Sequence, residues 1–284
     1  MNLSKIFRRW VQFFFCACCL LVVAFSVPFL KPLPFAWTEM NGELRAVIFF
    51  LAAAFLLHAV LTLSTANALR LFGIAFLFSY AAEYVGLRWS GFLGNLYRYS
   101  PALSPTLPGG VPIIVVLMWF ILAYTALKFL QPVAAEQGNS RPLTRILFKG
   151  GLCALHITAT DLFIDPLGTH GGLWSWQEQG GYYGTPWGNF GAWFLVGLII
   201  SCLYLSAEKP LSPDRRTTDD PWDMIFIAVA VSLTFVCFAA CYIHLDSVVP
   251  VALSLIVLGP FWVFRAVYHR RVQPVMSPRP SSVT

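Results

Sequence analysis

Three carboxylates lie within apolar stretches of this sequence and give the first indication of chemistry. Glu83 lies in the run YAAEYVG, and Asp161 and Asp165 lie in the run TDLFIDP. An ionisable side chain in such surroundings is costly and is by default a candidate functional group. A buried carboxylic acid can hold its proton near neutral pH, while a second carboxylate can accept one. The three acids therefore predict acid–base chemistry in an apolar setting.

Asp161 and Asp165 are four residues apart, which places them on one face of a helix, one turn from each other. Pro166 follows directly and disfavours helical backbone at the residue before it, so we expect this helix to end at Asp165. Two like charges so close together would repel. We therefore expect at least one of the two aspartates to hold a proton or to pair with Arg88 or Arg98.

The histidines give weaker evidence than the acids. His156 lies on a different helical face from Asp161, and we interpret it as a packing residue whose hydrogen bonds are satisfied. His170 and His244 fall toward the same side as the acids and are secondary candidates, whereas His58 and His269 are interpreted as structural or interfacial.

The composition defines the setting of these residues. Of the 284 residues, 58% are hydrophobic and only 11% are charged, and the apolar residues form blocks about twenty residues long. This excludes an ordinary soluble protein, and the blocks are too long for the strands of a β-barrel. The net charge of +6 forms no basic face, so no nucleic-acid partner is expected. The seven cysteines lack metal-ligand spacing, and no metal site is predicted.

The sequence predicts an all-α, polytopic integral membrane protein with about eight transmembrane helices. A single membrane domain is expected over residues 1–272, followed by a disordered tail over 273–284. The positive-inside rule places both termini in the cytoplasm, because only Lys31, Arg45, Arg88 and Arg98 then lie outside. The expected spans are Trp10–Leu30, Arg45–Ser64, Leu69–Gly86, Val111–Leu130, Ile146–Asp165, Phe190–Ser206, Asp223–His244 and Val248–Val267.

In this topology the third and fifth spans run in the same direction, so the three acids approach the outer side together. The segments that follow these spans, Leu87–Gly110 and Leu167–Trp193, are rich in glycine and aromatic residues and poor in charge. They are too apolar for solvated loops and too interrupted for helices, so we interpret them as re-entrant or interfacial lids. An aromatic belt at the membrane surface explains Trp37, Trp89, Trp187 and Trp193 equally well.

Several motifs around the acids resemble the membrane-integral carotenoid biosynthesis family, which includes gamma-carotene and bisanhydrobacterioruberin hydratases. The resemblance covers roughly residues 80–193. The motifs are E-x-x-G at Glu83 and Gly86, G-x-x-G-x-x-Y-x-Y from Gly91 to Tyr99, G-V-P from Gly110 followed by Trp119, D-x-x-x-D-P from Asp161, W-x-W at Trp174 and Trp176, and Y-Y-G-x-P-x-x-N from Tyr182 to Asn189, followed by Gly191 and Trp193.

The resemblance implies hydration of the terminal C=C bond of an acyclic carotenoid, without a cofactor. It also implies a carotenoid substrate within the bilayer, contact with other enzymes of the carotenoid pathway, and a bacterial or archaeal cell membrane. Chemistry then suggests Asp161 or Asp165 as proton donor and Glu83 as the group that orients water. The candidate substrate-binding residues are Tyr80, Arg88, Tyr97, Tyr99, Trp174, Trp176, Tyr182, Tyr183 and Asn189.

Three other functions remain open from the sequence. The spacing D-x-x-x-D also occurs where prenyltransferases bind a diphosphate through a divalent metal. Acids within a membrane also relay protons in proton-coupled carriers. A third possibility is a pigment-binding protein without catalytic activity.

Overall fold

The computed structural model describes residues 3–26, 41–89, 96–130, 142–209 and 221–276. Within these residues, eight helices are long and apolar enough to cross a membrane. The all-α polytopic membrane fold is thus confirmed. The helices are α1 Leu3–Ser26, α2 Asn41–Leu63, α3 Thr65–Gly86, α4 Ile113–Leu130, α5 Pro142–His170, α6 Trp187–Ala207, α7 Pro221–Leu245 and α8 Val249–Met276.

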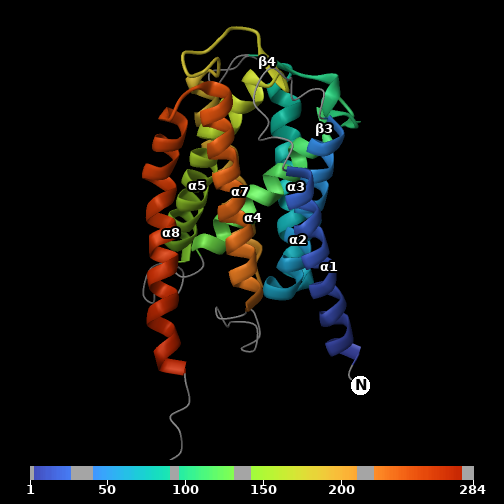
Figure 1. The fold of residues 1–284 in the computed structure, drawn as a ribbon, viewed down its shortest axis with the longest axis vertical. Helices are drawn as coiled ribbons and strands as arrows, with labels where there is room; N and C mark the ends of the chain where they lie inside the picture. The colour runs from blue at the N-terminus through green and yellow to red at the C-terminus, as the bar shows by residue number, and fades with distance from the viewer. Residues whose placement is uncertain (1–2, 27–40, 90–95, 131–141, 210–220, 277–284) are drawn as a thin grey trace, which may run out of the picture.

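Helix α4 lies at the centre of the bundle and packs against α2, α3, α5, α6 and α8. Most of its side chains are buried, including Trp119, Phe120 and Tyr124. Figure 1 shows that α1 begins and α8 ends at the same end of the bundle, opposite the strands. Helix α8 continues to Met276, past the predicted domain boundary at residue 272, and residues 277–284 lie outside the described part of the chain. The predicted division into domain and tail stays a prediction.

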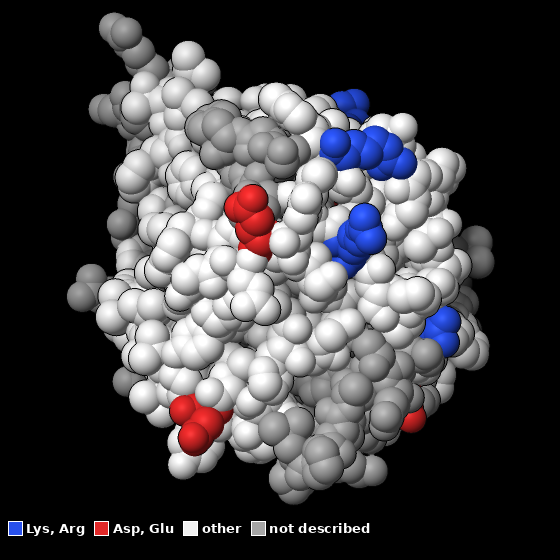
Figure 2. Space-filling view, turned by 90° about the horizontal axis from the view of Figure 1, so that it is seen from above, with Lys and Arg blue, Asp and Glu red and all other residues white. Residues whose placement is uncertain are grey.

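The two glycine- and aromatic-rich segments meet at the opposite end of the bundle. Strand β1 (Tyr97–Tyr99) from the first segment pairs antiparallel with β4 (Trp174–Trp176) from the second. A second short pair joins β2 (Thr106–Leu107) to β3 (Val111–Pro112) within the first segment. Figure 2 looks onto this end and shows a face on which charged side chains are few and scattered. The loops therefore form a mostly uncharged cover, held together by backbone hydrogen bonds.

A buried ion-pair cluster joins four helices on the other side of the bundle centre. The Asp223 carboxylate of α7 lies 2.9 Å from Nζ of Lys128 on α4 and 3.4 Å from Nη2 of Arg265 on α8. Nε2 of His58 on α2 lies 3.2 Å from the same carboxylate, and its Nδ1 is 2.7 Å from the hydroxyl of Tyr124. The structural role expected of His58 agrees with these contacts. Asp223, placed at the end of a span from the sequence, is a fourth buried acid.

Helix α5 corrects one sequence-based expectation, because it does not end at Asp165. It continues through Pro166 to His170. Proline has no N–H to donate to the carbonyl four residues earlier, which here belongs to Leu162. The hydroxyl of Tyr182 donates to that carbonyl instead, at 3.0 Å. A side chain from the following loop thus supplies the missing donor and lets the helix continue past the proline.

This arrangement predicts an energetic coupling between Tyr182 and Pro166. Tyr182→Phe leaves the Leu162 carbonyl without a donor and should destabilise the protein by about 1–3 kcal/mol. Pro166→Ala restores a helical N–H, so in that background the cost of Tyr182→Phe should fall by half or more. Denaturant unfolding of the four proteins in detergent measures both values. An equal cost in the two backgrounds would show that Tyr182 does not replace the missing helix bond.

Candidate active site

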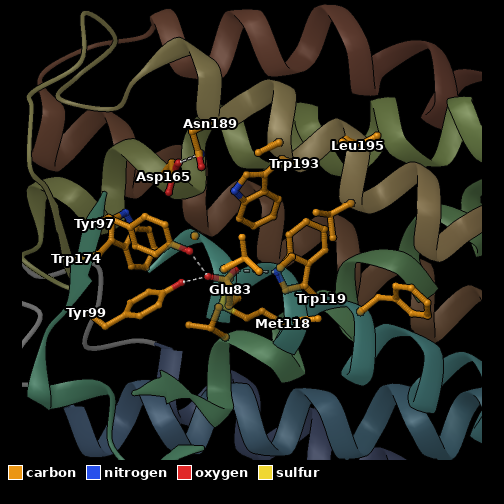
Figure 3. Close-up of a pocket in the computed structure, with 18 of the residues that line it drawn as sticks. Glu83, Tyr97, Tyr99, Met118, Trp119, Asp165, Trp174, Asn189, Trp193 and Leu195 are labelled. Atoms are coloured by element: carbon orange, nitrogen blue, oxygen red, sulfur yellow. Dashed lines mark hydrogen bonds between the residues drawn. The ribbon is translucent and has the colours of Figure 1, made fainter. Parts of the chain in front are cut away.

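Glu83 is the centre of a hydrogen-bond network built from three elements (Figure 3). Its Oε2 accepts hydrogen bonds from the hydroxyls of Tyr97, at 2.5 Å, and Tyr99, at 2.7 Å. Its Oε1 accepts a hydrogen bond from Nε1 of Trp119 on α4, at 3.1 Å. An ionised carboxylate only accepts hydrogen bonds, so three donors aimed at it match that form. Trp119 was part of the sequence motif but was not among the predicted site residues.

The pairing of β1 with β4 explains why four aromatic side chains gather beside Glu83. Alternate residues of a strand point to the same face, so Tyr97 and Tyr99 project together. Their cross-strand partners, Trp176 and Trp174 respectively, project from the same face of the pair. Burial, followed by the neighbouring Glu83 charge, raises the pKa of both phenols well above their usual range. Both tyrosines therefore stay neutral hydrogen-bond donors.

Gly86, one turn after Glu83 on α3, makes room for this network. A Cβ atom at this position would lie only 2.8 Å from the hydroxyl oxygen of Tyr97. Heavy atoms that are not bonded to each other do not pack this closely, so any other residue would push the ring away from Glu83. The E-x-x-G motif thus has a steric cause in this fold.

Asn189 joins the two aspartates on α5. Its Nδ2 lies 3.2 Å from Oδ2 of Asp161 and also donates to Oδ2 of Asp165. Both carboxyl groups are almost fully buried, at 0% and 4% exposure. Pairing with Arg88 was one of the alternatives expected for the aspartates, and it is not found, because that guanidinium lies 3.8 Å from the ring centroid of Tyr84 and donates to backbone carbonyls. Arg98 is exposed on β1, away from these buried groups.

Glu83, Asp165 and Asn189 line one cavity of about 480 Å³ between α3, α4, α5 and α6. The strands close it on one side through Tyr97, Tyr99, Trp174 and Trp176. Its wall also includes apolar side chains exposed on the surface of the bundle, so the cavity reaches the face that meets lipid. These exposed residues are Phe78, Val85, Trp89, Leu195 and Ile199. Asp161 is not part of the lining and lies behind Asn189.

Trp119 and Trp193 form a stacked pair in the wall of this cavity, with ring centroids 4.4 Å apart. Trp193 therefore belongs to the site. Trp187 is exposed as expected of a surface belt, and Trp89 is both exposed and part of the cavity wall. Trp37 lies outside the described residues. Sequence spacing gave no signal for the Trp119–Trp193 pair, because its members come from different spans.

Four predicted substrate-binding residues lie outside this lining. Tyr80 donates a hydrogen bond to the carbonyl of Pro108, and Arg88 is held at Tyr84 as described. Tyr182 supports α5, and the hydroxyl of Tyr183 contacts that of Ser247 at 2.5 Å. The structure thus brings Tyr97, Tyr99, Trp174, Trp176 and Asn189 together with the acids, and gives the other four positions contacts elsewhere.

The histidines divide in a similar way. His170 is exposed, and His244 is buried on α7 without lining the cavity. His156 is buried at 4% exposure, as expected of a packing residue. Within the described part of the chain, however, neither of its ring nitrogens makes a hydrogen bond, so the expectation of satisfied hydrogen bonds is wrong. Among the same residues, no three acidic, histidine or cysteine side chains cluster at metal-binding distances.

Residues 43–260 match the family described as "Carotenoid biosynthesis protein". The chain belongs to this family. The matched region includes every residue that lines the cavity, so the carotenoid biosynthesis family shares the part of the fold that contains the site. The family match also agrees with the resemblance predicted from the motifs.

A curated relative supports the same assignment. The chain is 30% identical over 146 residues to the bisanhydrobacterioruberin hydratase of Haloarcula japonica. The aligned region is 51% of this chain and 47% of the relative, so the chain spans about half the length of that protein. No solved structure matches the chain. The comparisons thus establish a membrane protein of carotenoid biosynthesis that is similar to a hydratase.

The role of Gly86 predicts opposite effects for two glycine substitutions on α3. Gly86→Ala places a methyl group against the Tyr97 hydroxyl and should lower the free energy of unfolding by about 1–3 kcal/mol. Gly73→Ala is the control, because a Cβ there meets nothing within 4 Å. It should be neutral or stabilise the helix by up to about 1 kcal/mol. Equal effects of the two substitutions in denaturant unfolding would contradict the steric role of Gly86.

Proposed function

We propose that this protein is a hydratase that adds water across the terminal C=C bond of an acyclic carotenoid. The observation that carries the proposal is that two acids, Glu83 and Asp165, line the same largely apolar cavity among aromatic rings. The two acids have different hydrogen-bond partners, tyrosine hydroxyls for Glu83 and the Asn189 amide for Asp165. The similarity to a hydratase within the same family supports this reaction class. The reaction needs only a proton donor, a water molecule and a site that tolerates a carbocation.

Asp165 is the proposed proton donor. It lines the cavity, whereas Asp161 lies behind it, and both contact the same Asn189 nitrogen. Two negative charges held on one amide in apolar surroundings would repel strongly, so the pair is best accommodated with one proton. A proton on Asp165 faces the substrate, and the charge on Asp161 accepts the Asn189 hydrogen bond. Asp161 is thus a positioning residue for the acid.

Glu83 is the proposed base that orients the water molecule. Its three donors favour the ionised form, and a carboxylate with two oxygens has acceptor sites beyond those three. A water molecule bound at a remaining site would present its oxygen to the cavity. Glu83 would then accept the proton that this water loses as it bonds to carbon.

The proposed step is balanced in atoms and charge. Asp165 gives its proton to the less substituted alkene carbon, which leaves a tertiary carbocation on the other carbon. The water oxygen bonds to this carbon and releases one proton to Glu83, which produces a tertiary alcohol. Return of a proton from Glu83 to Asp165 restores the starting state, so the sum is addition of one water molecule.

The aromatic wall would stabilise the cation between these two steps. The faces of Trp and Tyr rings attract a cation within about 6 Å, by roughly 2 kcal/mol when water is excluded. Trp174, Tyr99 and the stacked pair of Trp119 and Trp193 line the same cavity as both acids. Most of the remaining lining is apolar, which would keep other water molecules from the cation until the bound one adds.

The substrate would reach the acids from the lipid. The cavity extends along α3 and α6 to exposed apolar residues, including Phe78 and Ile199. A polyene could lie along this surface with only its end beside Glu83 and Asp165. The excess of basic residues at the opposite ends of the spans supports a cytoplasmic location for both termini, and with that orientation the site would lie near the outer leaflet.

Substitution of the acids tests the proposal in a host that makes lycopene-type carotenoids, with mass analysis for the gain of one water. Asp165→Asn and Glu83→Gln should each lower conversion by about 10²–10⁴-fold, because each removes a proton-transfer group. Asp161→Asn should have a smaller effect, since its carboxyl group does not line the cavity. Immunoblots of the membrane fraction control for protein amount. Wild-type conversion by both the Asp165 and Glu83 variants would disprove the assignment.

The tyrosine donors should affect the rate through Glu83 alone. Tyr97→Phe and Tyr99→Phe each remove one hydrogen bond to the carboxylate and keep the ring, so a loss of about tenfold in turnover is expected. Tyr80→Phe is the matched control, because its hydroxyl contacts a backbone carbonyl outside the cavity. Kinetic measurement in membranes should show the loss for the first two variants only. An effect of the same size in Tyr80→Phe would indicate a general response to hydroxyl removal.

A further inference from the structure

A second cavity of about 240 Å³ lies inside the bundle, beside the first. Its wall is formed mainly by α2, α4, α5, α7 and α8, and none of its lining residues is exposed. The wall also includes Ser26 of α1 and, from the covering segments, Leu103, Leu173 and Trp174. The two cavities share four wall residues, of which Figure 3 labels Met118 and Trp174. The shared residues are Val115, Met118, Ile164 and Trp174.

The polar atoms of this second cavity are nearly all committed to the helices themselves. The hydroxyls of Ser26, Thr125, Thr160 and Thr234 each donate to a carbonyl one turn earlier in their own helix. Within the described residues, two wall side chains are exceptions, Trp174 and His156. Nε1 of Trp174 has no hydrogen-bond partner, and neither has either ring nitrogen of His156. The His156 ring is buried beside Phe129 and Phe261, with ring centroids 5.6 and 5.7 Å away.

A buried polar group without a partner is destabilising, and native structures contain few of them. A neutral imidazole has one N–H donor and one acceptor nitrogen, which together match a hydroxyl group, itself both a donor and an acceptor. Apart from the hydroxyl groups already bonded within their own helices, the wall is mainly aliphatic and aromatic, so it suits a branched hydrocarbon. The volume holds on the order of eight groups the size of a water molecule, which is close to two isoprene units.

We propose that the second cavity is a binding site for an isoprenoid end that carries one hydroxyl group, with His156 as its hydrogen-bonding anchor. The ligand is either a free ten-carbon isoprenoid alcohol or the hydroxylated end of a longer chain. The hydroxyl contacts the imidazole, and the hydrocarbon occupies the space between α2, α4 and α7. The site is separate from Glu83 and Asp165 and needs no catalysis to be occupied.

The test compares linalool, a ten-carbon tertiary alcohol, with myrcene, a hydrocarbon of the same skeleton that lacks the hydroxyl. Calorimetric titration of the purified protein in lipid nanodiscs, corrected with empty nanodiscs, gives both affinities. The wild-type protein should bind linalool about three- to tenfold more tightly, the value of one net hydrogen bond. In His156→Leu this preference should disappear while binding of myrcene is kept. Equal affinities in the wild type, or a preference that survives in His156→Leu, would overturn the proposal.

Two cavity-filling variants locate the bound alcohol. Ala230→Leu on α7 fills the second cavity only, and Ala82→Leu on α3 fills the first cavity only. Loss of the preference for linalool in Ala230→Leu, with no change in Ala82→Leu, supports the site. The reverse result would place the alcohol in the first cavity and contradict it.

A stability measurement separates ligand binding from a purely structural role of His156. Without ligand, His156→Leu should unfold at the same or a higher temperature than the wild type, because leucine leaves no buried polar atom unpaired. A clear decrease would show that His156 serves packing instead.

The two sources of the ligand are distinguished by purification from a pigment-producing host. Hydroxylated carotenoid that copurifies with the wild type and is lost in Ala230→Leu identifies the chain end. Binding of linalool without such copurification identifies the free alcohol. These measurements do not depend on turnover, so their failure would leave the proposed hydratase activity standing.

Discussion

The constraint on which this structure depends is that a polar group inside an apolar bundle must find its partner within the protein. Glu83 meets it through donors from β1 and α4, and this requirement fixes the covering strands onto the bundle. The carbonyl of Leu162 meets it through Tyr182, which ties the second loop to α5. At the far side of the bundle, Asp223 meets it through cations from α4 and α8. Packing of apolar side chains alone would not specify these positions, because lipid is as apolar as they are.

Much of the fold and the centre of the site followed from the sequence for the same reason. Apolar blocks about twenty residues long leave helices as the only structure that satisfies their backbone, so eight spans could be counted directly. Charged residues are rare in these blocks, and an ionisable side chain in a membrane span costs free energy. Glu83, Asp161 and Asp165 could therefore be identified as candidate functional residues from the sequence. Their placement toward one end followed from the direction of the third and fifth spans. Glu83 and Asp165 line one cavity because their helices run in the same direction and carry the two acids toward the same end of the bundle.

The contacts that the sequence did not predict join residues from different elements. Asp223 and Lys128 are 95 residues apart, and Arg265 comes from a third helix, so no spacing marked them as partners. Pro166 was expected to end its helix because proline has no N–H and disfavours helical backbone at the residue before it. This local argument does not include Tyr182, which donates the missing hydrogen bond from the following loop. Arg88 was one possible partner of the aspartates by charge, but it contacts the ring of Tyr84 and nearby backbone carbonyls instead. In the first two cases the partner is distant in the chain, and in the third the arginine contacts residues closer to it than the aspartates.

The different roles proposed for Glu83 and Asp165 rest on their different hydrogen-bond partners. Glu83 receives three donors, which stabilise a negative charge without any nearby cation. Asp165 shares a single amide with a second carboxyl group, an arrangement that favours retention of a proton. In the proposed reaction these different hydrogen-bond partners suit Glu83 to the role of base and Asp165 to the role of acid within one apolar cavity. Among the described residues, no lysine or arginine lines the cavity, so no fixed cation there opposes positive charge on a bound alkene.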